Sequence, residues 1–339
     1  MSDSHPETLH DVGERGLVER LRARVGASPA FVHVGIGDDA AVLEPERGAL
    51  DVVTTDSLIE DVHFRRAWTD ARAIGAKAVA VNFSDLAAMG ARPRAVLLGL
   101  ALPPSLPVRE FDALVDGVVS ACAAERAALV GGNLARSPGP LVVDVTAMGS
   151  VRPRRMLVRS GGRAGDELYI TGSIGAAWAG LAMLEAGLDR AALDEAARAC
   201  VDRYEQPSAR VRCGRFIAAS RSASAAIDVS DGLVDAAAQL SEAGGTGVEL
   251  DASAIPIHPG AAEWCRASGR DPVLSAIAGG EDYELLFAVP PKRRRAFLAA
   301  VGRTGGLACT RIGSLTADRG TWLTRSGTRE PLPGGFRHF

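Results

Sequence analysis

The residues of this sequence best suited to chemistry are aspartates placed at the ends of short apolar runs or on one helix. The set is Asp38, Asp39, Asp56, Asp85, Asp228 and Asp231. Their neighbours are small: Gly35, Gly37, Ala40, Thr54, Thr55, Ser57 and Ser84. Small flanking residues let a ligand approach the backbone closely, which a merely solvated acidic surface does not require.

Gathered carboxylates repel one another and raise one another's pKa unless cations neutralise them, so convergence of these aspartates implies bound metal. An all-oxygen ligand set favours magnesium, manganese or calcium. The five cysteines are scattered without a C-x-x-C pair, which disfavours zinc. Magnesium bound with a nucleotide is the usual pairing. Taken singly, an Asp-Asp pair after glycine is a common turn, and it is the set of such groups that favours a function.

Two glycine-rich segments are candidate phosphate-binding loops, since backbone amides at such turns can cradle phosphate oxygens. They are Gly131-Gly132-Asn133 and Gly279-Gly280-Glu281-Asp282. Each alone is equally consistent with a tight turn between strands. The chain has no G-x-x-x-x-G-K-[ST] loop and no G-x-G-x-x-G fingerprint, so ATP binding would use neither of the two commonest nucleotide folds.

The elements that must position these residues alternate between strands and helices, which predicts a mixed α/β fold. Strands are expected at 31–36, 50–54, 95–102, 141–151, 168–171, 225–229, 247–250, 283–289 and 308–314. Helices are expected at 17–25, 70–90, 108–126, 233–243 and 291–301, with more across 175–220. Asp70 and Asp231 are candidate N-caps, and Gly90 is a candidate helix stop. Asn82 and Asp85 lie one turn apart on the helix at 70–90.

Length and composition predict two domains, and the scattered cysteines and the polar N-terminal residues predict a cytoplasmic protein. A chain of 339 residues with 47% hydrophobic content is long enough for two cores. The basic, glycine-rich stretch at 152–166 is the best boundary, which gives an ATP- and metal-binding domain at 1–151 and a second α/β domain at 152–339. A net charge of -3 argues against nucleic acid as a partner. No run approaches the roughly 20 apolar residues that cross a bilayer, so no membrane partner is expected.

Several segments together resemble the thiamine-monophosphate kinases, members of an ATP-dependent superfamily that includes aminoimidazole ribonucleotide synthetase and selenophosphate synthetase. The resemblance spans nearly the whole chain. It is carried by GIGDDAAVL (35–43), TTDSLIEDVHF (54–64), KAVAVNFSDLAAMGARP (77–93), GGNLARSPG (131–139), RSGGRAGDELYITG (159–172), IDVSDGL (227–233) and GGEDYELLF (279–287).

The resemblance implies a role for each matching position. Its magnesium ligands would be Asp39, Thr54, Thr55, Asp56, Asp85, Asn133, Asp228 and Asp231, of which Asp39, Asp56, Asp85 and Asp228 are the catalytic candidates. Gly132, Asn133, Arg159 and Ser230 would contact ATP, while His63 and Glu281 would face thiamine monophosphate. The resemblance also implies several magnesium ions and a homodimer whose N-terminal strands form a shared barrel.

Two positions depart from the family pattern. Asn133 stands where the family usually has aspartate, which removes one negative charge from the metal cluster. The aromatic residue that many members place over thiamine is not aligned here, and Trp322 and Phe336 are the candidates. His63 also has a plainer interpretation, since a lone histidine between Val62 and Phe64 is more often simply packed.

The expected reaction is in-line attack of the acceptor phosphate on the γ-phosphorus of ATP. Two alternatives stay open. One is another enzyme of the superfamily, although selenophosphate synthetases usually carry a reactive cysteine near the N-terminus and none precedes Cys122 here. The other is a non-catalytic metal- or nucleotide-binding protein, to which Asn133 gives some weight.

Overall fold

The computed structural model describes residues 7–334 and has the mixed α/β fold that the sequence predicted. The chain divides into two compact units. Unit 1 comprises the residues up to Leu86 together with Pro93–Ser150. Unit 2 comprises Ala87–Arg92 and the chain from Val151 onward.

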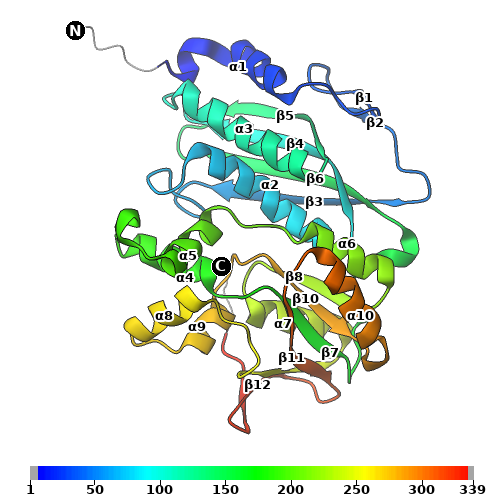
Figure 1. Ribbon diagram of the computed structural model, residues 1–339. Helices are drawn as coiled ribbons and strands as arrows, with labels where there is room; N and C mark the ends of the chain where they lie inside the picture. The colour runs from blue at the N-terminus through cyan, green and yellow to red at the C-terminus, as the bar shows by residue number, and fades with distance from the viewer. Residues whose placement is uncertain (1–6, 335–339) are drawn as a thin grey trace. The chain divides into compact units, whose positions relative to one another are not determined.

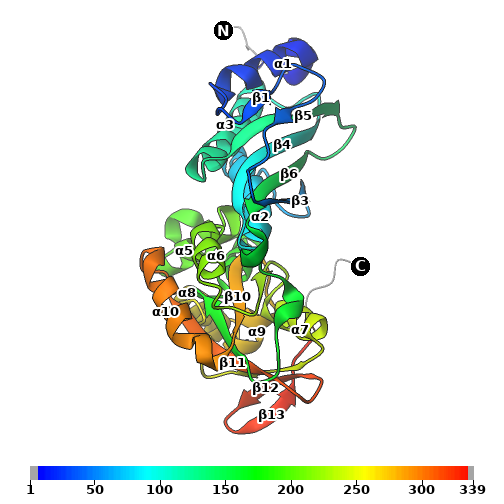
Figure 2. The same ribbon diagram turned by 90° about the vertical axis from the view of Figure 1, so that its right-hand side faces the viewer.

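Unit 1 is built on a four-stranded sheet with the strand order β3-β6-β4-β5 (Figures 1 and 2). Its elements are α1 (Leu9–Val25), β1 (Val32–Val34), β2 (Val42–Leu43), β3 (Leu50–Ile59), α2 (Ala71–Ala88), β4 (Arg92–Leu102), α3 (Val108–Ala124), β5 (Ala128–Arg136) and β6 (Val142–Val151). Helices α2 and α3 lie side by side on one face of the sheet. Their close contact requires glycine: a Cβ on Gly75 would lie 2.1 Å from the Leu114 carbonyl oxygen, and one on Gly117 would lie 2.0 Å from that of Arg72.

The two faces of this sheet differ in burial. On β4, Val96, Leu98 and Leu100 are buried, whereas the residues between them are only half-buried. Since successive side chains of a strand point to opposite faces, the buried set faces the helices and the other set faces away from them. On the edge strand β3, Val53 is 61% exposed. The face of β3 and β6 opposite the helices therefore carries exposed apolar surface.

Unit 2 contains a seven-stranded sheet with the order β13-β12-β9-β11-β7-β10-β8. Neighbouring strands in this sheet run antiparallel, except β9 and β12, which are parallel. The strands are β7 (Glu167–Thr171), β8 (Ala225–Val229), β9 (Gly247–Asp251), β10 (Glu284–Val289), β11 (Cys309–Thr316), β12 (Thr321–Arg325) and β13 (Thr328–Pro331). The α-helices are α4 (Ala176–Glu185), α5 (Glu195–Glu205), α6 (Val211–Ser220), α7 (Leu233–Gly244), α8 (Pro259–Ala267), α9 (Pro272–Ala278) and α10 (Arg294–Val301).

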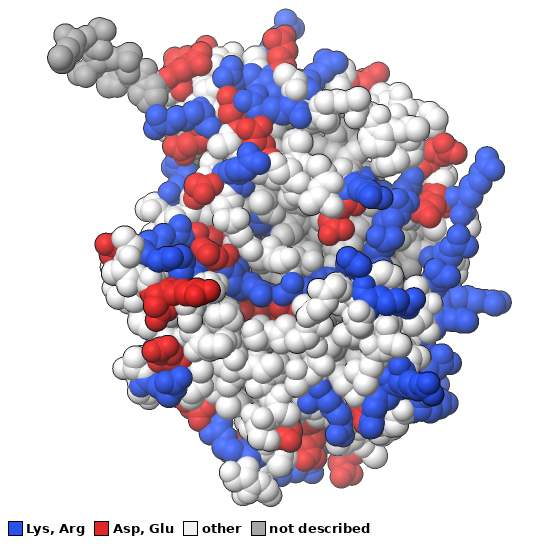
Figure 3. Space-filling model, viewed as in Figure 1, with Lys and Arg blue, Asp and Glu red and all other residues white. Residues whose placement is uncertain are grey.

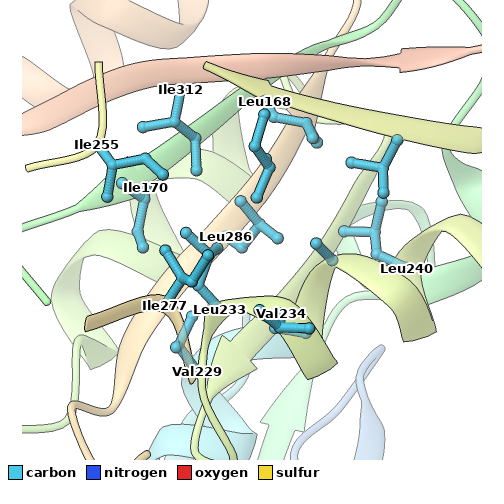
Figure 4. Packing of buried hydrophobic residues seen from close by; sticks show 14 of the residues in the cluster. Leu168, Ile170, Val229, Leu233, Val234, Leu240, Ile255, Ile277, Leu286 and Ile312 are labelled. Atoms are coloured by element: carbon cyan, nitrogen blue, oxygen red, sulfur yellow. The ribbon is translucent and has the colours of Figure 1, made fainter. Parts of the chain in front are cut away.

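Helices cover both faces of the central strands in unit 2. On one face, Ile170 and Leu286 pack with Leu233 of α7 in a buried apolar cluster (Figure 4). On the other, the ring of Phe297 on α10 lies 4.9 Å from that of Tyr169 and 5.6 Å from that of Phe287. Strands β7, β8 and β10 are consequently buried throughout.

The structure corrects several details of the sequence prediction. Strand β3 continues to Ile59, so Asp56 lies inside a strand rather than after one. The Gly131-Gly132-Asn133 segment likewise lies within β5. Helix α1 begins at Leu9 and is kinked at Gly13, whose φ is 70°. Asp231 does not cap α7, because the N-cap residue is Gly232 and it makes no side-chain cap.

Candidate functional site

A cavity of about 970 Å³ in unit 1 brings together three of the predicted site residues, Asp39, Gly132 and Asn133. Its walls come from α1, the segment between β1 and β2, and strands β3 to β6. Asp144 and Gly99 also line it. This volume falls in the range of small-molecule sites.

Glycines contribute to the lining of the cavity. A Cβ on Gly132 would lie 1.9 Å from the Leu98 carbonyl oxygen on the neighbouring strand, so a side chain there is excluded. Gly99 pairs with Asn133 in the β4–β5 ladder and adds no side chain beside it. Gly37, with φ of 117°, also lines the cavity. The close approach of β4 and β5 therefore requires glycine at position 132.

Asp144 is a cavity residue that the sequence interpretation missed. Its carboxylate accepts hydrogen bonds from Ser57 Oγ at 2.9 Å and from Thr55 Oγ1 at 3.3 Å. It lies on β6 next to Gly99, whose added Cβ would be 3.3 Å from that of Asp144. The signal in the sequence was a charged residue in the apolar run 141–151.

A second group of predicted residues lies where β3 faces α2. Thr54 Oγ1 on β3 donates a hydrogen bond of 2.5 Å to Asp85 Oδ2 on α2. Asp56 is two residues further along the strand and so shares the face of Thr54. The helix itself forms as predicted, since Asp70 Oδ1 accepts from the Ala73 amide at 2.8 Å and Gly90 ends it with a φ of 69°.

The side chains of Thr54, Asp56 and Asp85 offer only oxygen atoms as metal ligands, which suits magnesium. Among residues 7–334, no three His, Cys, Asp or Glu side chains are gathered as a ready-made metal site. Magnesium is usually bound through one or two carboxylates together with substrate phosphates, rather than in an all-protein cage. The Thr54–Asp85 pair and Asp56 therefore fit an ion that a nucleotide helps to hold.

His63 lies in a tight loop after β3. Its Nδ1 accepts a hydrogen bond from the Ile59 amide at 3.1 Å, so in the neutral ring the proton is on Nε2. Buried Lys77 on α2 donates from Nζ to the His63 carbonyl oxygen at 3.1 Å. The loop is thus fixed from both sides, and the packed and binding interpretations of His63 are compatible.

Replacing Lys77 by methionine is expected to loosen this loop. The change keeps most of the apolar stem but removes the donor to the His63 carbonyl, at a cost of about 1–3 kcal/mol. Hydrogen exchange of the Val62 and His63 amides, which both donate to Ile59, should become at least roughly tenfold faster. Lys292→Met is the matched control, because Lys292 is exposed. Unchanged exchange in Lys77→Met would contradict this role.

In unit 2 the loops after β8 and before β10 bring Ser230, Asp231 and Glu281 together. The Glu281 amide donates to the Ser230 carbonyl oxygen at 2.6 Å. Asp228, one residue before the end of β8, is 5% exposed. Arg159 instead lies against α7, where its Nη1 donates to Gln239 Oε1 at 2.5 Å.

Two buried carboxyl groups follow Glu281. Burial raises the pKa of Asp282 to about 7, although hydrogen bonds from the Gly175 and Ala177 amides lower it. Burial would also raise the pKa of Glu284, but its bonds to Arg210 and the charge of Arg203 outweigh burial and hold that pKa below its ordinary value. Glu284 is therefore an ionised internal group.

The predicted residues are divided between the two units. Unit 1 holds Asp39, Thr54, Thr55, Asp56, His63, Asp85, Gly132 and Asn133. Unit 2 holds Arg159, Asp228, Ser230, Asp231 and Glu281.

Of the two aromatic candidates, Trp322 on β12 packs beneath Arg329, whose guanidinium carbon is 4.5 Å from the ring centroid. Phe336 lies outside the described residues.

On the face of the molecule drawn in Figure 3, acidic and basic side chains are mixed on the left, whereas basic side chains predominate along the right-hand edge. Within residues 7–334, no helix has the length and apolar character needed to span a bilayer.

Comparison with known families defines the class of this protein. Residues 37–151 match the N-terminal domain of the AIR synthase related proteins, and residues 163–324 match their C-terminal domain. Solved structures of the hydrogenase maturation protein HypE share the fold, with a TM-score of 0.78 at 19% identity for its complex with ATP.

Nearer relatives narrow the class. Thiamine-monophosphate kinase of Salmonella typhimurium is 37% identical, over 96% of this chain and 98% of that protein. The Stenotrophomonas maltophilia kinase structure has a TM-score of 0.81 at 35% identity, covering 91% of this chain and 95% of that one. The structure described as "AaThiL complexed with AMPPCP and TMP" has a TM-score of 0.77 at 31% identity, covering 99% and 100%. The chain belongs to the thiamine-monophosphate kinase family.

Proposed function

We propose that this protein transfers the γ-phosphoryl group of ATP to thiamine monophosphate, producing thiamine diphosphate and ADP. The observation that carries the proposal is the end-to-end match to a relative whose solved structure contains an ATP analogue and thiamine monophosphate. The segments that carry the sequence resemblance include the cavity of unit 1 and the paired loops of unit 2. The enzyme would act in the cytoplasm, where ATP is available.

The residues of unit 1 would hold the phosphate groups. Gly132, Asp39 and Asn133 line one cavity, where phosphate oxygens would lie. Thr54, Thr55, Asp56 and Asp85 would be the oxygen ligands of magnesium in this unit, with Asp228 and Asp231 in unit 2. When bound, magnesium supplies positive charge that neutralises the transferring phosphoryl group.

The chain need not supply a strong base. A phosphate monoester has a second pKa of about 6 and is largely ionised at neutral pH, so its oxygen is already a nucleophile. The protein's contribution is to orient donor and acceptor in line and to exclude competing water. In this arrangement Arg159 and Ser230 would contact ATP, and His63 and Glu281 would hold thiamine monophosphate.

Asn133 gives this chain one fewer acidic ligand than the family pattern. An amide oxygen can still bind magnesium, but without a full negative charge. Asp144 lies on the same face of the sheet, beyond Gly99, and retains a carboxylate in the cavity. The proposal accordingly places Asn133 as a neutral ligand.

The exposed sheet face of unit 1 supports a homodimer. Val53, 61% exposed on β3, and the half-buried Met148 and Leu97 lie on the face that α2 and α3 leave uncovered, where they also line the cavity, so a partner subunit would cover part of it. Pairing two copies of this face would close the sheets into a shared barrel and remove the exposed edge.

Val53→Glu is expected to weaken this dimer by at least roughly tenfold, because each protomer would bury an uncompensated carboxylate. Sedimentation velocity over a range of concentrations measures the change. Leu298→Glu is the control, since Leu298 is 45% exposed on α10 of unit 2. A wild-type chain that sediments as a monomer at all concentrations would rule out the dimer.

Formation of ADP with a panel of acceptors tests the proposed function. We expect ADP only with thiamine monophosphate, and not with thiamine or with the substrates of the related synthetases. The rival interpretation is a protein that binds metal only for stability. It predicts that a chelator lowers the melting temperature while no acceptor yields ADP, whereas the kinase proposal predicts acceptor-dependent ADP that the chelator abolishes.

A further inference from the structure

Two loops of unit 2 are fitted together without space between them. One is loop 230–232, between β8 and α7, and the other is loop 279–283, between α9 and β10. A Cβ on Gly280 would lie 2.6 Å from the Ser230 carbonyl oxygen, and one on Gly232 would lie 2.9 Å from that of Gly279. Neither loop can shift toward the other.

Loop 279–283 has an unusual backbone. Glu281 and Tyr283 have φ values of 67° and 50°, a region that residues other than glycine seldom occupy. Their amides donate to the carbonyl oxygens of Ser230, at 2.6 Å, and Val229, at 2.9 Å. Strained conformations of this kind persist only where the surroundings hold them.

Asp282, which lies between Glu281 and Tyr283, holds the backbone in this conformation. Asp282 is fully buried, and its carboxylate accepts hydrogen bonds from the Gly175 amide at 2.6 Å and the Ala177 amide at 3.1 Å, at the start of α4. Arg203 Nη1 donates to its carbonyl oxygen at 3.2 Å. The side chain is thus bonded to backbone amides and has no contact with solvent.

Buried apolar residues on either side of each loop hold the ends of both loops in place. Val229 and Leu233 flank the first loop, Ile277 and Leu286 flank the second, and all four belong to one cluster (Figure 4). The ends of both loops are therefore fixed by packing, while Asp282 fixes the middle of the second.

We propose that Asp282 is a positioning residue for the phosphate acceptor, which sets the place of Glu281 against Ser230 through its bonds to α4. This inference rests on the proposed function, in which Glu281 faces thiamine monophosphate. In this proposal Asp282 acts only through Glu281. The backbone is strained at both of its neighbours, Glu281 and Tyr283.

The Asp282→Asn variant tests whether the hydrogen bonds of Asp282, and not merely its buried volume, position Glu281. Asparagine has nearly the same shape but only one acceptor oxygen, and its amide group would face one of the two N–H donors. One anchoring bond is lost and a repulsive contact replaces it. Glu281 should then depart from its position while α7 and Ser230 keep their packing.

Steady-state kinetics provide the test. We expect Asp282→Asn to raise KM for thiamine monophosphate by at least about tenfold and to change KM for ATP by less than about twofold. In a Glu281→Gln background the same change should add less than about twofold, because both act on one contact. Asp194→Asn is the matched control: Asp194 caps α5 through the Ala197 amide, and its loss should leave both constants unchanged.

Equal effects on the two substrates, or effects that multiply in the double variant, would overturn the inference. Hydrogen exchange of the wild-type protein covers the case in which Asp282→Asn does not fold. The Glu281 and Tyr283 amides should exchange as slowly as those of β10, and fast exchange there would also overturn it. If the wild-type protein makes no thiamine diphosphate, the proposed function fails instead, and the exchange data still test the anchor.

Discussion

Asp85→Ala is expected to lower the turnover number by at least about three orders of magnitude while leaving the protein folded. In phosphoryl transfer, charge neutralisation and positioning supply most of the catalysis, so losing a carboxylate that we propose as a magnesium ligand would remove the main contribution. Thr54, which donates to Asp85 at 2.5 Å, is half-buried and can turn its hydroxyl to water. Asp56→Ala should behave in the same way.

The measurement is initial rate together with melting temperature for each variant. Asp116→Asn is the control, because Asp116 is a surface residue of α3 paired with Arg24 and has no place in the proposed site. Near-normal turnover by either alanine variant would remove that residue from the catalytic set.

Glu284→Ala should have the largest effect on stability. The buried Glu284 carboxylate accepts from Thr171 Oγ1 at 2.6 Å, from Arg203 Nη1 at 2.9 Å and from Arg210 Nε at 2.7 Å. Removing it leaves two arginines without their main partner, which typically costs about 3–5 kcal/mol. Urea unfolding measures the change. Arg325→Met, which breaks the half-exposed pair with Asp271, should cost less than about 1 kcal/mol, and a similar small loss for Glu284→Ala would contradict this account.

The same carboxylate gives a pH dependence of known sign. The pKa of Glu284 is held below its ordinary value of 4.5, so the unfolded chain takes up a proton before the folded chain does. Its contribution to stability is therefore complete above that value and is lost as pH falls through the lower, folded-state pKa. Glu284→Gln should lack this part of the acid destabilisation.

The sequence predicted most of the local elements and failed at specific points. The helix after Asp70 was predicted because its cap, its apolar face and its glycine stop all agree. Strand β3 was ended too early, at 54, since the Thr-Thr-Asp-Ser run looks like the end of a strand. It continues because the hydroxyls of Thr55 and Ser57 bind Asp144 on the neighbouring strand, a pairing distant in sequence.

In the candidate site, too, contacts between residues distant in sequence could not be predicted. Asp39 was selected from one motif and Gly132 and Asn133 from another, and the structure places all three in one cavity. The roles of Asp144 and Asp282 were not predicted, because an acidic residue in or beside an apolar run does not show in the sequence which groups it will contact. Their roles depend on Gly99 and Gly175, which come from other parts of the chain.

The most direct test is to incubate the purified protein with ATP, magnesium and thiamine monophosphate and to follow the products by phosphorus NMR. Our account predicts the paired resonances of thiamine diphosphate growing in step with those of ADP, and no reaction when thiamine replaces its monophosphate. Release of inorganic phosphate without thiamine diphosphate, or no consumption of ATP at all, would contradict it.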